Sequence, residues 1–204
     1  MIVIVDYKMG NLGSITNIIK KIGYDSIVSS DVNVIQKGTK VILPGVGSFD
    51  KAMINLKELG LIDVLNQRAL IDKVPVLGIC LGMQLLTNSS EEGVEKGLGW
   101  IDAKTVKFQL SDFPDLKIPH MGWNEVNFPQ PHFLCEDYHE VPRFYFVHSY
   151  HAVCSKEENV LMNTKFGYEF ASGIVKENIM GVQFHPEKSH KFGMNLFKNF
   201  IEKC

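Results

Sequence analysis

Short apolar runs alternate with helix-periodic segments through residues 1–99. Residues 2–5 form an unbroken apolar run, and after a polar segment Ile15, Ile18, Ile19 and Ile22 recur at helical spacing. The alternation repeats, with strands expected at 25–28, 41–43 and 74–79 and helices expected around 31–37, 53–59, 61–70 and 81–86. This rhythm predicts an α/β fold with a doubly wound, mainly parallel sheet and helices on both faces.

The pattern changes after Gly99. Helical periodicity disappears until a last segment at 191–202, and strands are expected at 100–108, 123–128, 144–153, 170–175 and 179–184. Short connections between them, such as 176–178, predict an added antiparallel β region. No repeat or long linker divides the chain, so we expect residues 1–204 to form a single domain.

Composition narrows the class of protein. The chain has 45% hydrophobic and 22% charged residues, as ordinary globular proteins do. A formal net charge of −2 and a pI near 6.4 provide no basic surface for nucleic acid or for an acidic membrane. No apolar stretch approaches the roughly 20 residues that span a bilayer, and the segment MIVIVDYKMGN reads as a first strand rather than a signal peptide. Four widely spaced cysteines predict neither a disulfide scaffold nor a metal pair, which favours the cytoplasm.

One cysteine lies between a predicted strand and a predicted helix. It belongs to Gly78-Ile79-Cys80-Leu81-Gly82, which has the G-x-nucleophile-x-G pattern of a sharp turn that exposes a reactive side chain. A thiol at a helix N-terminus is also favoured as thiolate. The alternative is that Cys80 is a small buried hydrophobic residue. Glycines two residues before and after it favour the nucleophile.

A base and an orienting carboxylate follow a later strand. The strand expected at 179–184 is followed by His185-Pro186-Glu187, so that Glu187 can hold the imidazole of His185 in one tautomer. Loops 8–11 and 44–48 also follow strands and precede helices. Because functional loops lie at the carboxyl ends of parallel strands, we expect these segments to meet at one edge of the sheet.

Two motifs together resemble those of a known family. GICLGMQ at 78–84 with GVQFHPE at 181–187 is similar to the double signature of class I, triad-type glutamine amidotransferases. Four further motifs resemble those of the glutaminase subunits of imidazole glycerol phosphate synthases, and the resemblance runs through nearly the whole chain: DYxxGN at 6–11, LPGVGSFD at 43–50, PHMGWN at 119–124 and YFVHSYH at 145–151.

The resemblance implies hydrolysis of L-glutamine to glutamate and ammonia through a cysteine thioester. Cys80 would be the nucleophile, His185 the base and then the acid, and Glu187 the residue that orients His185. The N–H of Leu81 would be one donor to the oxyanion. The other would come from the backbone of the 44–47 loop, around Val46 and Gly47, when its peptide is suitably turned.

The same resemblance implies the contacts to glutamine. They would come from the side chains of Gln84 and Glu92 and from the backbone of Gly47, Ser149 and Tyr150, with Glu92 opposite the α-ammonium group. Two alternatives without contact to glutamine stay open. Glu92, which lies in the acidic segment 89–96, could be a solvated surface side chain. Tyr150, like His148, could be a packed strand residue. The seven histidines are not spaced along the chain like a set of metal ligands, so neither a metal nor another cofactor is expected.

No residues remain for an acceptor site, so the ammonia must be used by another protein. The resemblance implies a TIM-barrel cyclase subunit in a heterodimer, which converts a phosphoribosyl-formimino carboxamide ribonucleotide into imidazole glycerol phosphate in histidine biosynthesis. The interface would include Asn11, Met121, Trp123, Asn124 and Lys188, although Met121 and Trp123 could instead pack inside the domain.

Two positions depart from the family pattern in the expected interface loop. Lys8 stands where glycine is usual, and Gly13 where arginine is common. They leave open the same glutaminase chemistry with a different cyclase-like partner, for instance one that amidinates a surface sugar. A cysteine hydrolase of peptides or γ-glutamyl compounds and a non-catalytic scaffold subunit are the other readings. PHMGWN argues against the hydrolase, and the intact Cys80, His185 and Glu187 argue against the scaffold.

Overall fold

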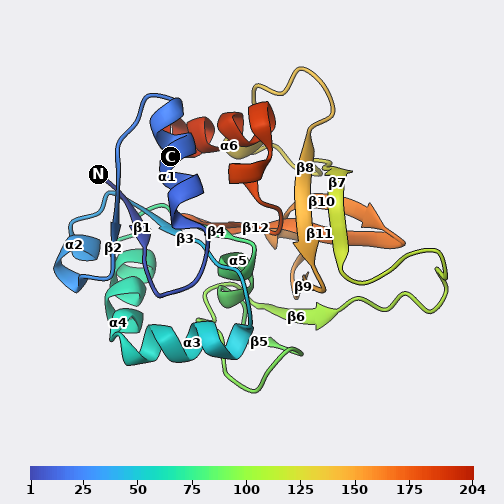
Figure 1. The fold of residues 1–204 in the computed structure, drawn as a ribbon, viewed down its shortest axis with the longest axis horizontal. Helices are drawn as coiled ribbons and strands as arrows, with labels where there is room; N and C mark the ends of the chain where they lie inside the picture. The colour runs from blue at the N-terminus through green and yellow to red at the C-terminus, as the bar shows by residue number, and fades with distance from the viewer.

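A ten-stranded mixed sheet runs through the protein (Figure 1). The computed structural model describes residues 1–204. Five neighbouring strands are parallel, in the order β2-β1-β3-β4-β12. Their bounds are β1 Ile2–Val5, β2 Ser26–Ser29, β3 Lys40–Leu43, β4 Val76–Ile79 and β12 Ile179–Val182.

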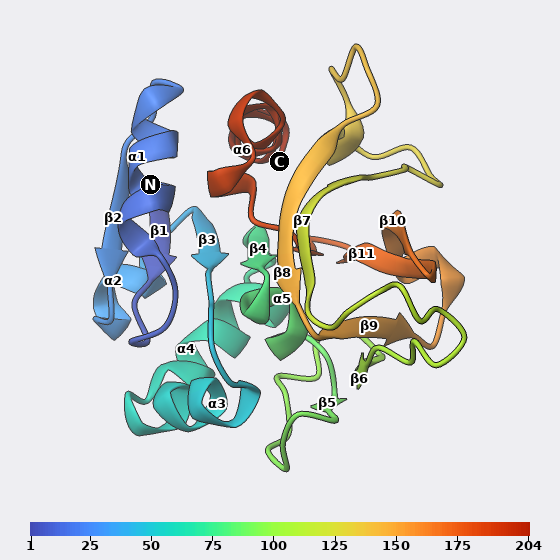
Figure 2. The same cartoon turned by 45° about the vertical axis from the view of Figure 1, so that its right-hand side comes forward.

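Beyond β12 the sheet continues with antiparallel pairs, except that the short strand β5 pairs with β6 in parallel. Strands β11, β9, β6 and β5 follow in that order, and β10 pairs with β11; their bounds are β5 Ser89–Ser90, β6 Ala103–Lys107, β9 Tyr150–Cys154, β10 Val160–Phe166 and β11 Tyr168–Lys176. A separate antiparallel pair consists of β7 (His120–Glu125) and β8 (Arg143–His148). Figure 2 shows this pair as a long curved ribbon beside the main sheet.

Helices cover both faces of the parallel strands (Figures 1 and 2). The first strand shows why: Ile2 and Ile4 pack toward one cluster of apolar side chains, and Val3 and Val5 toward another. The first cluster includes side chains of α1 (Leu12–Lys21) and α6 (His190–Lys203). The second includes those of α2 Val32–Gln36, α3 Phe49–Glu58, α4 Leu61–Asn66, the π-helix η1 Gln67–Ile71 and α5 Leu81–Leu85. Three short 3₁₀ helices complete the fold: η2 Phe133–Cys135, η3 Glu157–Asn159 and η4 Pro186–Lys188.

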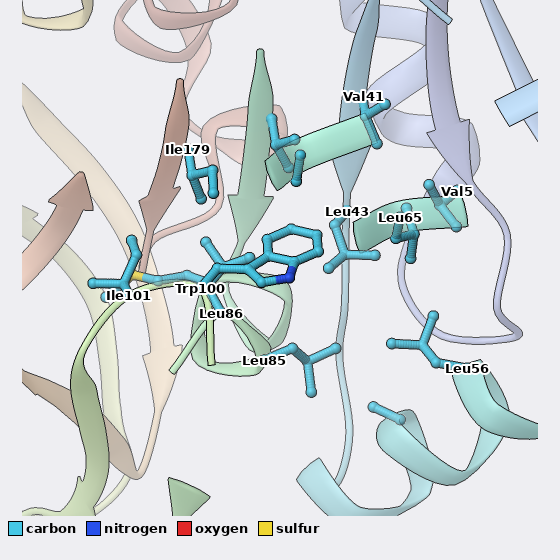
Figure 3. Close-up of a cluster of buried hydrophobic side chains, with 14 of the residues drawn as sticks. Val5, Val41, Leu43, Leu56, Leu65, Leu85, Leu86, Trp100, Ile101 and Ile179 are labelled. Atoms are coloured by element: carbon cyan, nitrogen blue, oxygen red, sulfur yellow. The ribbon is translucent and has the colours of Figure 1, made fainter. Parts of the chain in front are cut away.

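Trp100 is the largest fully buried side chain of the second cluster (Figure 3). Its ring lies among Leu43, Leu85, Leu86 and Ile101, between the helices and the sheet. The indole N–H donates to Asn66 Oδ1 at 2.7 Å, so this buried polar atom is satisfied. Trp100 therefore fastens the segment after Gly99 to the parallel half of the protein.

The predicted α/β class, with its parallel sheet, flanking helices and antiparallel extension, is confirmed. Several boundaries are wrong. The strand expected at 100–108 begins at Ala103, the strand expected at 123–128 lies at 120–125, and the helix expected at 61–70 widens into the π-helix η1. Strand β10 was not predicted, because register irregularities between Val160 and Asn163 break the two-residue alternation by which strands are recognised.

The single strand expected at 144–153 is the error with the largest consequence. The chain changes sheets at Ser149: β8 pairs with β7, whereas β9 pairs with β6 and, at one position, with β11. The Phe108 N–H donates to the Ser149 carbonyl at 3.1 Å and holds the crossover in place. This bend brings Ser149 and Tyr150 to the cavity described below. None of the helices is long and apolar enough to traverse a bilayer.

Candidate active site

The glycine-flanked turn around Cys80 places a non-glycine residue at positive φ. Cys80 has φ 54° and ψ −111°, and it joins the end of β4 directly to α5. Its N–H donates to the Val182 carbonyl of β12 at 2.8 Å, which ties the turn to the neighbouring strand. A Cβ on Gly82 would lie 1.8 Å from the Leu43 carbonyl oxygen, and one on Gly78 would lie 2.7 Å from that of Gly82. The predicted elbow is confirmed as a structure, and both glycines are required by close approach of backbone.

A pair of glycine substitutions tests this crowding. We expect Gly82→Ala to lower the free energy of unfolding by about 1–3 kcal/mol or more, because β3 and the elbow must move apart. Gly13→Ala is the matched control: Gly13 is helical, a Cβ there meets nothing within 4 Å, and alanine should stabilise the protein by about 0.5–1 kcal/mol. Urea unfolding of both variants measures the difference, and equal effects would show that the elbow is not crowded.

His185 and Glu187 form a buried pair at the end of β12. The His185 Nδ1 to Glu187 Oε1 distance is 2.7 Å, and their side chains are 1% and 2% exposed. Because a carboxylate accepts, Nδ1 carries the proton and Nε2 is left for chemistry. Nε2 is buried and has no hydrogen-bond partner. The backbone of His185 is held by Tyr145, whose carbonyl accepts its N–H at 2.8 Å, and by the Ser189 hydroxyl.

The electrostatics of His185 suit an imidazole that holds a proton. Burial by itself disfavours the charged form, but the neighbouring Cys80 sulfur and the Glu187 carboxylate outweigh burial and raise the pKa of His185 to about 10. Adjacent parallel strands explain the proximity, since Gly78 and Ile79 of β4 pair with Gly181 and Val182 of β12. The two sequence motifs therefore end side by side at one edge of the sheet, as predicted.

This raised pKa predicts the alkaline limb of activity. A group with a raised pKa keeps its proton below that value and loses it above, so the imidazolium that protonates a leaving amine is lost as pH rises through about 10. We expect kcat for glutamine hydrolysis to fall through that range, with folding followed in parallel by circular dichroism. A fall already complete near pH 7, without unfolding, would contradict the raised pKa.

The loop at 44–47 occupies the place expected for an oxyanion. The Leu81 N–H, the predicted first donor, donates to the Gly45 carbonyl oxygen at 3.3 Å. The Gly45-Val46 peptide thus directs its oxygen, an acceptor, toward the position where donors are needed. The Tyr7 hydroxyl donates to the carbonyl of the preceding loop residue, Pro44. In this structure the oxyanion site is closed by the protein's own backbone.

A cavity of about 330 Å³ opens beside Cys80. It is large enough for an amino acid, and it brings together every residue expected to contact glutamine. Its walls are Val46, Gly47, Cys80, Leu81, Gln84, Glu92, Pro119, Val147, His148, Ser149 and Tyr150. A larger groove of about 540 Å³ runs along β9, β10 and β11, but it contains no residue of the Cys80, His185 and Glu187 set.

The expected glutamine contacts have fixed positions in this cavity. Glu92 is not simply a solvated side chain: its Oε2 accepts from the Phe49 N–H at the start of α3, at 2.8 Å. Gln84 is buried and donates from Nε2 to the Tyr150 carbonyl at 3.3 Å. The Ser149 carbonyl accepts from the Phe108 N–H, so the carbonyls of Ser149 and Tyr150 are both engaged within the protein.

One buried polar residue of the site was not singled out from the sequence. Gln183 is 0% exposed; its Nε2 lies 3.8 Å from Cys80 Sγ, and its Oε1 accepts from Gln84 Nε2 at 3.1 Å. It connects the nucleophile to the cavity wall. The signal was available, because a glutamine inside an apolar strand next to a candidate base must satisfy its amide through specific partners.

The expected interface residues belong to three elements: Asn11 precedes α1, Met121, Trp123 and Asn124 lie on β7, and Lys188 lies on η4. Met121 and Trp123 are 63% and 41% exposed, so they do not pack inside the domain. Trp123 stacks on His190 at 5.5 Å, and Lys188 lies 5.6 Å from the Tyr145 ring. Asn11 caps α1 by accepting from the Ser14 N–H. Asn124 differs, because its amide donates inward to the Lys165 carbonyl and to His120.

Lys8, one of the two departures from the family pattern, has a left-handed backbone. Its φ is 66°, a conformation in which glycine is least strained, and this accounts for the usual residue at that position. The Asp6 carboxylate accepts the Lys8 N–H at 3.0 Å and stabilises the turn. Gly13 has open space around it, so an arginine would fit there. No group of three or more histidine, cysteine or acidic side chains is placed to hold a metal ion.

Comparisons with known proteins agree with this geometry. The family model for class I glutamine amidotransferases matches residues 3–204. The chain is 61% identical over 204 residues to an imidazole glycerol phosphate synthase subunit HisH 2 of Methanococcus maripaludis, with 100% of both chains covered. It is 47% identical over 202 residues to the HisH 2 subunit of Pseudomonas aeruginosa, with 99% of both covered. Among solved structures, PurLQS of Thermotoga maritima shares the fold, with a TM-score of 0.76 at 15% identity over 99% of this chain and 97% of that one.

Proposed function

This chain belongs to the class I glutamine amidotransferase family and, within it, to the HisH subunits of imidazole glycerol phosphate synthase, and from that premise we propose that it hydrolyses L-glutamine and supplies the ammonia to a cyclase subunit in histidine biosynthesis. The observation that most supports this function is the adjacency of β4 and β12. It places the Cys80 elbow beside the buried His185 and Glu187 pair, at the mouth of a cavity of amino-acid size. We further propose that residues 1–204 act as one amidotransferase domain.

The catalytic cycle uses the three residues in turn. Cys80 Sγ, whose proton has already passed to Nε2 of His185, attacks the side-chain amide carbon of glutamine. The tetrahedral intermediate collapses when the imidazolium gives that proton to the departing nitrogen, which leaves as ammonia. The γ-glutamyl thioester on Cys80 is then attacked by water, whose proton returns through His185 to the sulfur as glutamate is released. Glu187 keeps Nδ1 protonated throughout, because its Oε1 accepts from it at 2.7 Å.

The cavity accounts for the choice of glutamine. The α-ammonium group of glutamine pairs with Glu92, whose carboxylate is already held against the start of α3. Gln84 and the backbone of Gly47, Ser149 and Tyr150 line the path of the side chain toward Cys80. The amide carbon can then meet the sulfur while the α-carboxylate stays near the opening.

Ammonia leaves toward a partner. We assign the exposed Met121 and Trp123, with the neighbouring Lys188, to the contact with a TIM-barrel cyclase subunit in a one-to-one heterodimer. The cyclase would be the site where ammonia enters the phosphoribosyl-formimino carboxamide ribonucleotide. Copurification of the cyclase subunit, followed by formation of imidazole glycerol phosphate from glutamine and this nucleotide, tests the assignment. Failure with this nucleotide, but turnover with another acceptor, would redirect the proposal to a different cyclase-like partner.

The closed oxyanion loop predicts dependence on that partner. Alone, the chain has the Leu81 N–H occupied by the Gly45 carbonyl, and a turn of the Gly45-Val46 peptide would replace that oxygen with a second N–H donor. One oxyanion donor is worth about 10²–10³ in kcat. We therefore expect glutaminase activity to rise at least about a hundredfold when the nucleotide-loaded cyclase subunit is added. Equal turnover with and without the nucleotide-loaded cyclase subunit would falsify this regulation. The roles assigned to Cys80, His185 and Glu187 would not be affected by that result.

A further inference from the structure

Two buried histidines, His120 of β7 and His148 of the glutamine cavity wall, hydrogen-bond directly to each other. His120 Nδ1 and His148 Nε2 are 2.9 Å apart. The side chains come from neighbouring strands, since His120 opens β7 and His148 ends β8 opposite it. The residues are 4% and 6% exposed, and neither had been assigned a role in the reaction.

Their surroundings permit only one arrangement of protons. His148 Nδ1 lies 2.7 Å from the Tyr150 carbonyl, which can only accept, so this nitrogen carries the hydrogen. In a neutral ring, His148 Nε2 is then an acceptor, and His120 Nδ1 must donate to it. His120 Nε2 is left as the acceptor for the Asn124 amide, at 3.1 Å. Both rings therefore carry their hydrogen on Nδ1, and every bond in the chain points toward Tyr150.

Neutral rings are what this site favours. Burial lowers the pKa of His120 to about 4 and holds that of His148 well below its ordinary value. His120 is also stacked between Phe146 and Phe166, with ring centroids 4.7 and 4.2 Å away. A proton on Nε2 of His148 would place two donors face to face. The hydrogen bond between the two rings is therefore kept only when both rings are neutral and carry their hydrogen on Nδ1.

The chain of bonds ends where the cavity is built. The Tyr150 carbonyl accepts from His148 and also from Gln84 Nε2, so both of its lone pairs are used. Gln84 donates in turn to Gln183, whose amide reaches Cys80 Sγ at 3.8 Å. Tyr150 directly follows Ser149, the residue at which the chain changes sheets. The orientation of this peptide segment thus depends on the donor that His148 presents.

We propose that His120 and His148 are positioning residues that hold the Ser149-Tyr150 wall of the glutamine cavity through a hydrogen-bond chain of fixed direction. This role rests on the proposed function, because it concerns the binding of the same substrate. Neither ring touches the reacting atoms. Their effect is on how well glutamine is seated, so it belongs to KM more than to kcat.

Two substitutions of His120 separate this role from simple packing. His120→Phe keeps an aromatic ring between Phe146 and Phe166 but removes the donor to His148. His120→Asn gives up the stack, but its amide nitrogen occupies the place of Nδ1 and keeps the donor. In the complex with the cyclase subunit, we expect His120→Phe to raise KM for glutamine about tenfold with a smaller change in kcat, and His120→Asn to stay within about threefold of the unchanged protein. An unchanged KM for glutamine in His120→Phe, together with a raised KM in His120→Asn, would overturn the proposal.

The proton arrangement is measured without any activity assay. Nitrogen-15 NMR of the full chain labelled at histidine should show both rings neutral at pH 7, with the hydrogen on Nδ1 and Nε2 unprotonated. A hydrogen on Nε2 of either ring, or a charged ring, would overturn the proposal. Because this spectrum does not depend on turnover, it distinguishes failure of the positioning role from failure of the glutaminase assignment, in which the unchanged complex would be inactive.

Discussion

Replacement of Cys80 by alanine is expected to reduce glutamine-dependent amination by the two-subunit complex by about 10⁴-fold or more, while amination from free ammonia continues at its usual rate. The reason is that no thioester can form without the sulfur, whereas the cyclase receives dissolved ammonia directly. Cys80 is 6% exposed and small, and the elbow's geometry comes from Gly78 and Gly82. The fold should therefore survive the change. Product formation from the nucleotide, with glutamine or an ammonium salt as nitrogen source, measures both activities.

Cys154→Ala is the matched control for that experiment. Its thiol is also partly buried, but it lines the groove along β9 and β10 instead of the glutamine cavity. We expect it to keep both activities. If ammonia cannot rescue the Cys80 variant, the assigned division of labour between the two subunits is wrong.

Substitution of His185 by glutamine should lower kcat for glutamine hydrolysis by about 10²–10⁴. The amide cannot take the thiol proton or return it to the leaving nitrogen, although it can still bond to Glu187. Removal of the ring should also abolish the alkaline limb near pH 10, because that limb reports the proton held on His185. Steady-state kinetics across pH, with the cyclase subunit present, measure both effects.

His139→Gln provides the comparison for His185→Gln, since His139 is exposed and lies outside the cavity. Its kinetics should match those of the unchanged protein. Retention of more than about a tenth of the activity in the His185 variant would mean that another group serves as the base.

Much of the active site could be predicted from the sequence, because the chemistry lies in short contiguous segments. The elbow needs only a strand, two glycines and a helix within 76–85, and His185 with Glu187 needs only the end of a strand. Parallel α/β topology then predicts that the carboxyl ends of the strands share one edge of the sheet. The order of the strands, which makes β4 and β12 neighbours, is known only from the structure. The flanking helices followed from apolar spacing, as Ile15 and Ile19 of α1 illustrate.

The features that could not be predicted depend on backbone rotations and on distant partners. The direction of the Gly45 carbonyl is set by a peptide orientation that residue types alone do not determine. The break at Ser149 arises because β8 and β9 find partners in different sheets. His120 and His148 are 28 residues apart, and their pairing follows from the register of β7 on β8. Gln183 was visible in its motif, but its contact with Cys80 depends on strand order.

The most direct test of the glutaminase account is to trap the intermediate on Cys80. The complex with the nucleotide-loaded cyclase subunit is mixed with glutamine, quenched in acid during turnover, digested and analysed by mass spectrometry. The peptide that contains Cys80 should carry the mass of glutamine less ammonia, and prior alkylation by a reactive glutamine analogue at the same sulfur should prevent this. Steady turnover with an unmodified Cys80, or with the γ-glutamyl group on another residue, would contradict the account.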